Sequence, residues 1–362
     1  MFRKIKTLAA CFIVMIQCAV AQNVYTVNNT PGSPANYHIL QDALDNVPAG
    51  SIILLQSSAI NYGFGLIKKP LVIYGAGYFI GQNPAPNTQA LLNRSMVTHL
   101  SFVNGSQGSI VSGVSFVLNP TLDGQINQRI VCDSTSNISL SRCYFDYVPF
   151  GGFIHNRVFL IQNSSSISIK QSYINLQEAI LVPIKSSGIA FNNNVFVGSG
   201  VVNIIDVNQA PFDYTFNSNS FSGTMQYIDF TGGSFYNNVI IQNNLSYTIN
   251  ISGNMTVADH NVSNVNIFPA GGTNITNADG ANTYVGFSNP AISSQDGIWQ
   301  LKPGSVAIGY GIGGIDCGAY GGTGAYVLSG IPAIPNIYFA SVPQVGTSVG
   351  GLKIHLKIKA NN

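Results

Sequence analysis

The chain has 362 residues, of which 46% are hydrophobic and 8% are charged, with a formal net charge of +2. So few charges and so many apolar residues exclude an intrinsically disordered chain. They also remove the electrostatic basis for nucleic-acid binding, which needs a strongly basic face. The length suits one elongated β domain.

The first 21 residues have the pattern of a secretory signal peptide. An apolar run follows three basic residues, and the small residues Ala19 and Ala21 predict cleavage before Gln22. The run is 13 residues long, which is too short for a transmembrane anchor. Gln17 argues against a lipidated Cys18, because a small residue is expected there. We therefore expect a secreted or cell-surface protein, with no membrane span in the mature chain.

The predicted mature chain keeps three cysteines, Cys132, Cys143 and Cys317. An odd number leaves at least one thiol unpaired in a secreted chain. We favour buried thiols that pack as small apolar groups, and a Cys132–Cys143 bridge stays open. The spacing of cysteines and histidines suggests no zinc site.

Two near-identical stretches, SNISLSRCYF (136–145) and SSISIKQSYI (165–174), reveal an internal repeat. Each copy ends at an apolar anchor residue, and successive anchors are 29, 22, 25, 19 and 22 residues apart. A looser copy, GSIVSGVSFVL (108–118), precedes them. The anchors are Phe145, Ile174, Phe196, Phe221, Ile240 and Val262.

Apolar and polar residues alternate within each copy, as Ile138, Ser139, Leu140 and Ser141 illustrate, which is the period of a strand. Asn, Gly and Ser separate the short strands, as turns require. Repeats of twenty-odd residues built this way predict a β-solenoid of roughly eight to ten coils, in which equivalent strands stack in parallel. A sandwich or propeller needs longer strands and two-residue hairpins, and fits less well.

The segment YHILQDALDNVPAGSIILLQ (37–56) predicts an amphipathic helix over 38–47 and an apolar strand over 52–55. A further strand and a glycine turn follow in KKPLVIYGAG (68–77). This order resembles the start of the right-handed parallel β-helix proteins of the pectin-lyase-like group, over most of residues 24–322. In that group a helix caps the first coil and hides its unpaired edge. The resemblance implies a single-stranded right-handed parallel β-helix domain over 22–322.

The C-terminal part carries a second resemblance. VAIGYGIGGIDCGAYGG (306–322) is similar to the closing segment of secreted bacterial surface β-helix proteins, many of them uncharacterised. Residues 323–362 then form a short β appendage or the cap of the last coil. In GLKIHLKIKA (351–360), aliphatic residues alternate with Lys and His, which predicts a strand with one basic face. That face could bind a sorting partner or an acidic glycan, but lysines that protect a strand edge are the favoured interpretation.

Enzymes of the resembled group carry acidic calcium ligands with a basic residue, or aspartate clusters with a histidine. This chain has no Asp-Asp pair and a single glutamate, Glu178, which favours a protein without catalysis. One carboxylate pair remains, because Asp206 and Asp229 are 23 residues apart, with Lys185 in the preceding coil. Stacked on adjacent coils, they could hold a calcium ion or perform acid–base chemistry. Aspartates that cap turns or face solvent are the favoured alternative.

Two long loops, 118–130 and 146–158, interrupt successive coils and each end in an arginine and an aliphatic residue. We expect Arg129 and Arg157 to stack on one flank. Aromatic rings near polar groups suit sugar rings, although rings that pack the loop onto the coil are the simpler alternative. The candidate ligand-binding residues are Tyr147, Phe150, Phe153, His155, Arg157 and Arg129.

These patterns predict a β-helix protein that recognises polysaccharide or serves as a surface scaffold without catalysis. The alternative is a polysaccharide lyase or glycoside hydrolase that acts through Asp206 and Asp229. We expect a polysaccharide or surface glycan as partner, no cofactor unless calcium serves the enzyme, and we make no prediction of the oligomeric state. Buried asparagine stacks would bond from coil to coil, whereas His38, His99, His260 and His355 have no partner that the sequence identifies.

Overall fold

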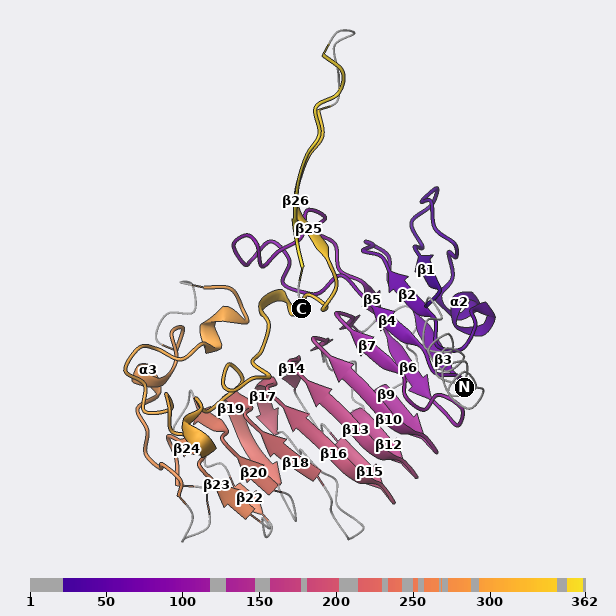
Figure 1. Ribbon diagram of the computed structural model, residues 1–362. Coiled ribbons are helices and arrows are strands. Elements are labelled where there is room, and N and C mark those ends of the chain that lie inside the picture. Colours follow the sequence, from indigo (N-terminus) through magenta and orange to yellow (C-terminus); the bar gives the residue numbers. More distant parts are fainter. Residues whose placement is uncertain are drawn as a thin grey trace, which may run out of the picture.

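The computed structural model describes residues 22–117, 128–146, 157–176, 181–201, 214–229, 234–242, 250–252, 257–266, 268, 273–287, 293–343 and 350–360. Its strands form three parallel sheets, here called A, B and C, through which the chain passes repeatedly in the order B, A, C (Figure 1). The predicted fold class, an all-β parallel β-helix with an N-terminal helix cap and a short C-terminal β segment, is confirmed.

Sheet A contains β1 (Val24–Val27), β2 (Ile52–Leu55), β4 (Val72–Tyr74), β7 (Ile110–Ser112), β10 (Ser136–Ser141), β13 (Ser165–Lys170), β16 (Ser187–Asn192), β18 (Tyr214–Asn217), β20 (Ser234–Tyr236) and β23 (Val257–Asp259). Sheet B contains β3 (Phe64–Ile67), β6 (His99–Phe102), β9 (Gln128–Asp133), β12 (Arg157–Gln162) and β15 (Leu181–Ile184). Sheet C contains β5 (Met96–Val97), β8 (Ser115–Phe116), β11 (Tyr144–Asp146), β14 (Tyr173–Leu176), β17 (Val195–Val201), β19 (Ser220–Asp229), β21 (Val239–Gln242), β22 (Asn250–Ser252) and β24 (Val262–Ser263).

The strand register confirms that the repeated stretches are successive coils. Leu140 pairs with Ile169, and the first five anchors pair in sequence from Phe145 to Ile240. The sixth anchor is wrong by one residue, because Ile240 pairs with Ser263 whereas Val262 pairs with Val239. Val262 lies on the outer side of sheet C, where the C-terminal part of the chain buries it. At this position the outward residue is apolar too, so the alternation of apolar and polar residues does not show which side chain points into the coil.

Columns of identical side chains fill the interior of the coil. Phe191, Phe216 and Phe235 stack with ring centroids 4.7 Å and 5.1 Å apart and nearly parallel planes. Phe196 and Phe221 stack in the same way at 4.6 Å. Such offset stacking adds to the stabilisation that burial alone provides.

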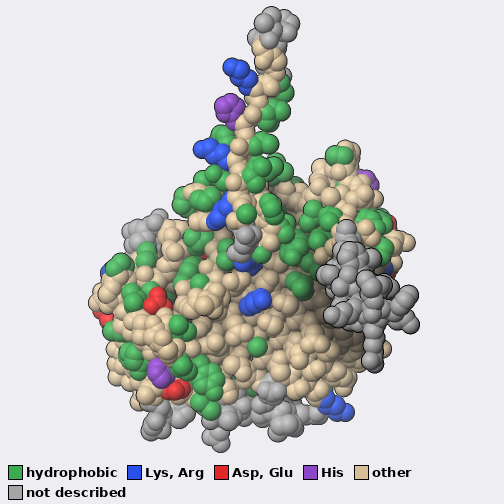
Figure 2. All heavy atoms as spheres, in the orientation of Figure 1, with side chains coloured by type: hydrophobic (Ala, Val, Ile, Leu, Met, Phe, Trp, Pro, Cys, Tyr) green, Lys and Arg blue, Asp and Glu red, His purple; other side chains and the backbone are tan. Residues whose placement is uncertain are grey.

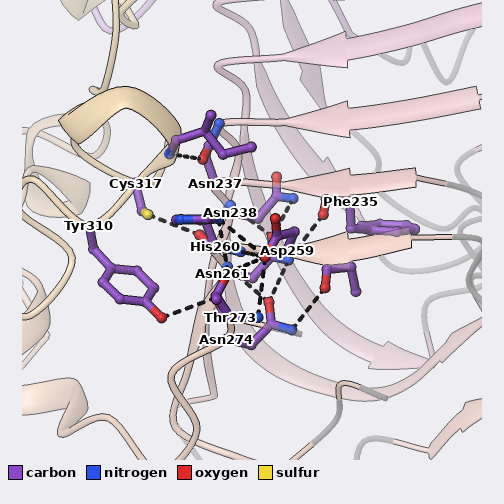
Figure 3. A network of polar contacts seen from close by, with 12 residues as sticks. Phe235, Asn237, Asn238, Asp259, His260, Asn261, Thr273, Asn274, Tyr310 and Cys317 are labelled. Atoms are coloured by element: carbon purple, nitrogen blue, oxygen red, sulfur yellow. Dashed lines mark hydrogen bonds and ion pairs between the residues drawn. The ribbon is translucent and has the colours of Figure 1, made fainter. Parts of the chain in front are cut away.

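A ladder of five asparagines, the first four of them buried, runs along the corner between sheets A and C, and Figure 3 shows its last three members. The side-chain amide of Asn194 donates to Asn219 Oδ1 at 3.1 Å and to the Ile169 carbonyl at 2.9 Å. Its own Oδ1 accepts the backbone N–H of Ser172 at 3.0 Å. The same pattern continues through Asn238, Asn261 and Asn274. The ladder therefore pairs backbone groups that the sharp corner would otherwise leave buried and unpaired.

Four asparagines of the ladder lie just after a strand of sheet A, and the residue before each of them has a positive φ. Asn193 has φ 55°, Ser218 has 54°, Asn237 has 56° and His260 has 52°. This left-handed conformation turns the chain sharply and points the corner side chain outward, away from the core.

The outward corner side chains hold residues 293–335, here called the strap. The strap runs back along the stack toward the first coils (Figure 1). The Asn193 side chain donates to the Gly321 carbonyl at 2.7 Å, and Asn237 Oδ1 accepts from the Ile312 N–H at 2.8 Å. Cys317 and Gly318 donate to the backbone carbonyls of His260 and Asn237. Its short helical turns, and the α-helix before it, are α3 (Gly280–Thr283), η2 (Gly297–Trp299), η3 (Ile312–Gly314) and η4 (Leu328–Gly330).

Farther along, the strap contacts earlier coils. Gln171 donates to the Ala325 carbonyl at 2.8 Å, and Arg142 donates to the Ile331 carbonyl at 2.8 Å. The strap then ends in an antiparallel hairpin of β25 (Asn336–Ser341) and β26 (His355–Lys359), which projects from the body (Figure 1). We call residues 336–343 and 350–360 the arm. The predicted C-terminal β segment thus lies beside the early coils.

The predicted helix cap is α2 (Leu40–Asn46), which closes the N-terminal end of the coil. Leu40 and Leu44 pack over Gly65 of β3, the edge strand of sheet B, where a side chain at position 65 would collide with Leu44 and with Leu100. The Gln41 side chain accepts from the Leu66 N–H at 2.8 Å and donates to its carbonyl at 3.2 Å. The helix thus pairs an edge that would otherwise invite another strand.

The cysteines are unbridged and buried, as the sequence favoured. Burial raises the pKa of the Cys132 and Cys143 thiols to about 12. These thiols therefore stay protonated at neutral pH and act as small apolar groups.

Replacing one residue of the ladder tests how strongly it stabilises the coil. We expect Asn194→Ala to lower the free energy of unfolding by about 1–3 kcal/mol, because it leaves the Ser172 N–H buried without a partner and removes a hydrogen bond to the Ile169 carbonyl. Urea unfolding followed by circular dichroism would measure the change. The matched control is Asn192→Ala on the outer face of the same coil, where a loss as large as that of Asn194→Ala would contradict the prediction.

Candidate functional site

Most of the predicted site residues lie outside the described residues. These are Asp206, Tyr147, Phe150, Phe153 and His155.

The proposed Asp206–Asp229 pair is therefore untested and stays a prediction. Asp229 is the last residue of β19 and pairs with Ser252 of β22. Val195 of β17 pairs with Ser220 of β19, 25 residues later, and a bulge then changes the register so that Val201 pairs with Tyr227. Lys185 is exposed at the corner after β15, with φ 48°.

The expected stacking of Arg129 and Arg157 needs correction. Arg157 of β12 pairs with Gln128 of β9, and Phe159 pairs with Ile130, so Arg129 lies opposite Val158 instead. The two arginines are therefore one register position apart and are not paired with each other. Arg129 is also only 2% exposed. The role of either residue in binding is untested.

No group of three His, Cys, Asp or Glu side chains within the described ranges could hold a metal ion. Calcium binding therefore stays a prediction tied to the Asp206–Asp229 pair. No helix in the described part of the chain is long and apolar enough to cross a membrane.

One concave feature that sequence reasoning missed is a groove of about 810 Å³, here called the coil groove. One wall is the outer face of the first coils, where Leu54 of β2 and Tyr74 of β4 pair side by side. The other wall is the end of the strap and the root of the arm, with Ile337 and Ala340. None of the described residues that line the groove carries a charged side chain.

Carboxamide side chains line the coil groove among its apolar walls. Gln56 Oε1 accepts from Asn28 Nδ2 at 2.9 Å, and Gln89 donates its amide to the Ala76 carbonyl. These contacts orient both glutamines. The Gln56 amide nitrogen and the Gln89 amide oxygen have no other partner in the described part of the chain, so a ligand can pair with them.

A buried polar network fixes the strap in the position that forms the groove. The carboxylate of Asp296 is fully buried, and it accepts from Asn83 Nδ2 at 2.9 Å and from the Ser329 N–H at 2.7 Å. Nearby, the hydroxyls of Tyr78 and Tyr326 lie 2.6 Å apart. Burial raises the pKa of both phenols well above the usual value, so they stay neutral hydrogen-bonding groups. This network is inaccessible and acts as an anchor.

Sequence reasoning could not find the coil groove, because its walls come from residues 28–91 and 331–342. The repeats between these segments reveal the coil but give no sign that the strap returns along it. The only signal was the proline-punctuated stretch IPAIPNIYF (331–339), which is incompatible with another coil strand.

A second polar cluster lies at the last coil, against the middle of the strap (Figure 3). His260 Nδ1 lies 3.2 Å from Asp259 Oδ1 and 3.0 Å from the Thr273 hydroxyl, which also bonds the Asp259 carboxylate. Tyr310 of the strap donates to the Thr273 carbonyl at 3.0 Å, and its ring lies beside the imidazole. Sequence reasoning found no partner for His260, although Asp259 precedes it directly.

The cluster holds the last coil and the strap together. The Thr273 hydroxyl, and then His260, hold the pKa of Asp259 below its usual range by bonding to the ionised form. A carboxyl whose pKa is lowered on folding stabilises the folded state only while it is ionised.

Asp259→Asn tests this electrostatic contact. The carboxylate makes its full contribution to the free energy of unfolding above the ordinary Asp pKa of about 3.9. That contribution is lost as pH falls through the lower pKa that Asp259 has in the folded protein. We expect wild-type protein to melt at a higher temperature than Asp259→Asn at about pH 5, and the difference to close toward about pH 2.5. An equal difference at both pH values would contradict the assignment, and exposed Asp45→Asn is the control.

Comparison with protein-family models and with curated proteins found no match. Among solved structures, an alginate lyase from Paenibacillus sp. str. FPU-7 is similar over 66% of this chain and 94% of the lyase, with 11% sequence identity and a TM-score of 0.27. A likeness this weak carries no argument about function. The parallel β-helix is established by the strand pairing of the chain itself.

Proposed function

We propose that this chain is a secreted or cell-surface β-helix protein that recognises polysaccharide without catalysis, and that the glycan lies in the coil groove. The observation that carries the proposal is the combination of apolar walls, the Tyr74 ring and oriented carboxamides in an uncharged groove of about 810 Å³. Sites for small ligands have this volume and this mixture of apolar surface with a few polar groups.

Sugar rings match both kinds of surface in the groove. The C–H faces of a pyranose pack on aromatic and aliphatic side chains such as Tyr74 and Leu54. Its hydroxyls both donate and accept, as do the carboxamides of Gln56 and Gln89. A carboxylate would lose hydration in the groove without meeting a cation, because none of the described residues that line it carries a charged side chain. The groove therefore favours a neutral stretch of polysaccharide.

The outer face of sheet A gives a longer glycan a surface beyond the groove. Ser139 pairs with Ser168, and farther along Thr215 pairs with Ser234, so small, partly exposed hydroxyl side chains form a row on this face. Equivalent positions recur at roughly 4.8 Å per coil. An extended chain along the stack can therefore meet small hydroxyl groups on several coils.

A lyase or hydrolase that acts through Asp206 and Asp229, with or without calcium, is the second candidate function. Such an enzyme would also bind polysaccharide, but it would cleave the chain and release products. One experiment therefore separates the two candidates when binding and bond cleavage are measured on the same samples.

The experiment uses the mature chain, residues 22–362, with a panel of neutral polysaccharides, with and without calcium. Calorimetry measures binding, and assays for reducing and unsaturated ends measure cleavage. We expect binding without product. Product that disappears in the Asp206→Asn, Asp229→Asn double variant would overturn the non-catalytic proposal.

Filling the groove tests its location. Ala340→Trp places a large ring in the groove from the arm, and we expect at least about tenfold weaker binding of the best neutral glycan. Ser341→Trp, on the other face of the same strand, is the matched control and should bind as wild type. Equal affinity of both variants would move the glycan site away from the coil groove.

A further inference from the structure

The two faces of the arm differ sharply in chemistry. Strand alternation in β26 and the residues before it places Lys353, His355, Lys357 and Lys359 on one face and the aliphatic residues between them on the other. Figure 2 shows blue and purple side chains along one side of the projecting arm and green along the other. We call the first side the basic face.

The basic face points away from the coil groove. Across the hairpin, Leu356 pairs with Ala340 and Ile358 pairs with Ile337. Ile337 and Ala340 line the groove, so the aliphatic face of the arm forms the groove wall. Beyond Lys359, which pairs with the groove-lining Asn336 and is half-buried, the basic face lies on the opposite side. Lys353, His355 and Lys357 are exposed there.

The arm is the cationic part of an otherwise acidic mature chain. Residues 1–21 carry +3 and residues 323–362 carry +3, so with +2 overall, residues 22–322 carry −4. No acidic residue follows Asp316. In the described ranges no ion pair involves an arm lysine, although Lys359 donates to Asn87 Oδ1 at 3.3 Å. The charges of Lys353 and Lys357 are therefore available to an anion.

An aromatic ring lies among these charges. A register shift between Ile337 and Phe339 lets Phe339 pair with Lys357, on the basic face. The Lys357 Nζ lies 5.4 Å from the ring centroid, and Phe339 is 43% exposed. An exposed ring beside an ammonium group suits a sugar that carries a carboxylate, because the ring takes the C–H face and the lysine takes the charge.

Edge protection and membrane contact account less well for the basic face. Lysines that only protect a strand edge do not need an exposed aromatic ring among them. A bilayer would have to contact the aliphatic and the basic side chains together, but these lie on opposite faces.

We propose that the basic face, through Lys353, His355, Lys357 and Phe339, is a second binding site that takes a linear acidic polysaccharide. Successive cations on this face lie two strand residues apart, roughly 6.8 Å, which suits an extended ligand with repeating charges. The site goes beyond the proposed function, since it needs charge whereas the coil groove excludes it.

The test uses mature protein and polygalacturonate, with dextran as the uncharged comparison. We expect polygalacturonate binding that weakens steeply with added salt, and a dissociation constant at least about tenfold higher for Lys353→Glu, Lys357→Glu. Lys68→Glu, Lys302→Glu makes the same change of net charge elsewhere and should bind as wild type. The proposal would be overturned if both double variants lost polygalacturonate affinity equally, or if Lys353→Glu, Lys357→Glu bound it as wild type does.

Phe339→Leu distinguishes a sugar from other polyanions. We expect it to weaken polygalacturonate binding several-fold while polyphosphate binding stays unchanged, and phosphatidylglycerol vesicles should bind more weakly than polygalacturonate. Equal effects on polygalacturonate and polyphosphate, or preferred binding of vesicles, would overturn recognition of an acidic sugar. We expect sedimentation to show no self-association through the basic face. Self-association that the Lys353→Glu, Lys357→Glu variant abolishes would instead assign this face to a second copy of the chain.

The groove variant separates this site from the proposed function. Ala340→Trp should leave polygalacturonate binding unchanged while neutral glycans bind more weakly. Loss of both ligands in that variant would overturn the independence of the two sites. If the variant loses only the binding of neutral glycans, both proposed sites are supported. If the wild-type protein binds no neutral glycan, the coil-groove proposal fails and the polygalacturonate measurement still tests the basic face.

Discussion

The structure depends on how a buried corner pairs its backbone groups. A coil of twenty-odd residues must turn sharply out of sheet A, and each turn uses a left-handed residue such as Asn193 or Asn237. The residue that follows points inward and leaves backbone groups without strand partners. An asparagine at that position, as in Asn219 and Asn238, supplies a donor and an acceptor to the neighbouring coil. Stacked coils therefore stabilise one another at the point where a single coil would be least stable.

The same corner also creates the outer architecture. Because the ladder residue points inward, the left-handed residue before it points outward, where Arg142, Gln171 and Asn193 hold the strap. The strap carries the arm back to the first coils and places Ile337 opposite Leu54. Both proposed binding sites follow from this course, one between arm and coil and the other on the opposite face of the arm.

Much of the coil could be predicted from sequence, because stacking makes successive coils alike. Phe145, Ile174 and Phe196 occupy the expected register since a column of inward side chains must match. The prediction failed at Val262, where the strap buries an outward residue and removes the contrast between the two sides. The coil groove was not predicted, because contacts between residues near 54 and 337 leave no local pattern.

The route of the strap sets the order in which the molecule can become complete. Coils can stack from the N-terminus as the chain emerges, since each contacts mainly its neighbours. The coil groove, however, combines residues from the first two coils with Ile334 and Ile337, some 280 residues later. Binding competence is thus acquired last, when the far end of the chain has crossed every coil to reach the beginning. A chain interrupted anywhere within the stack would lack the groove.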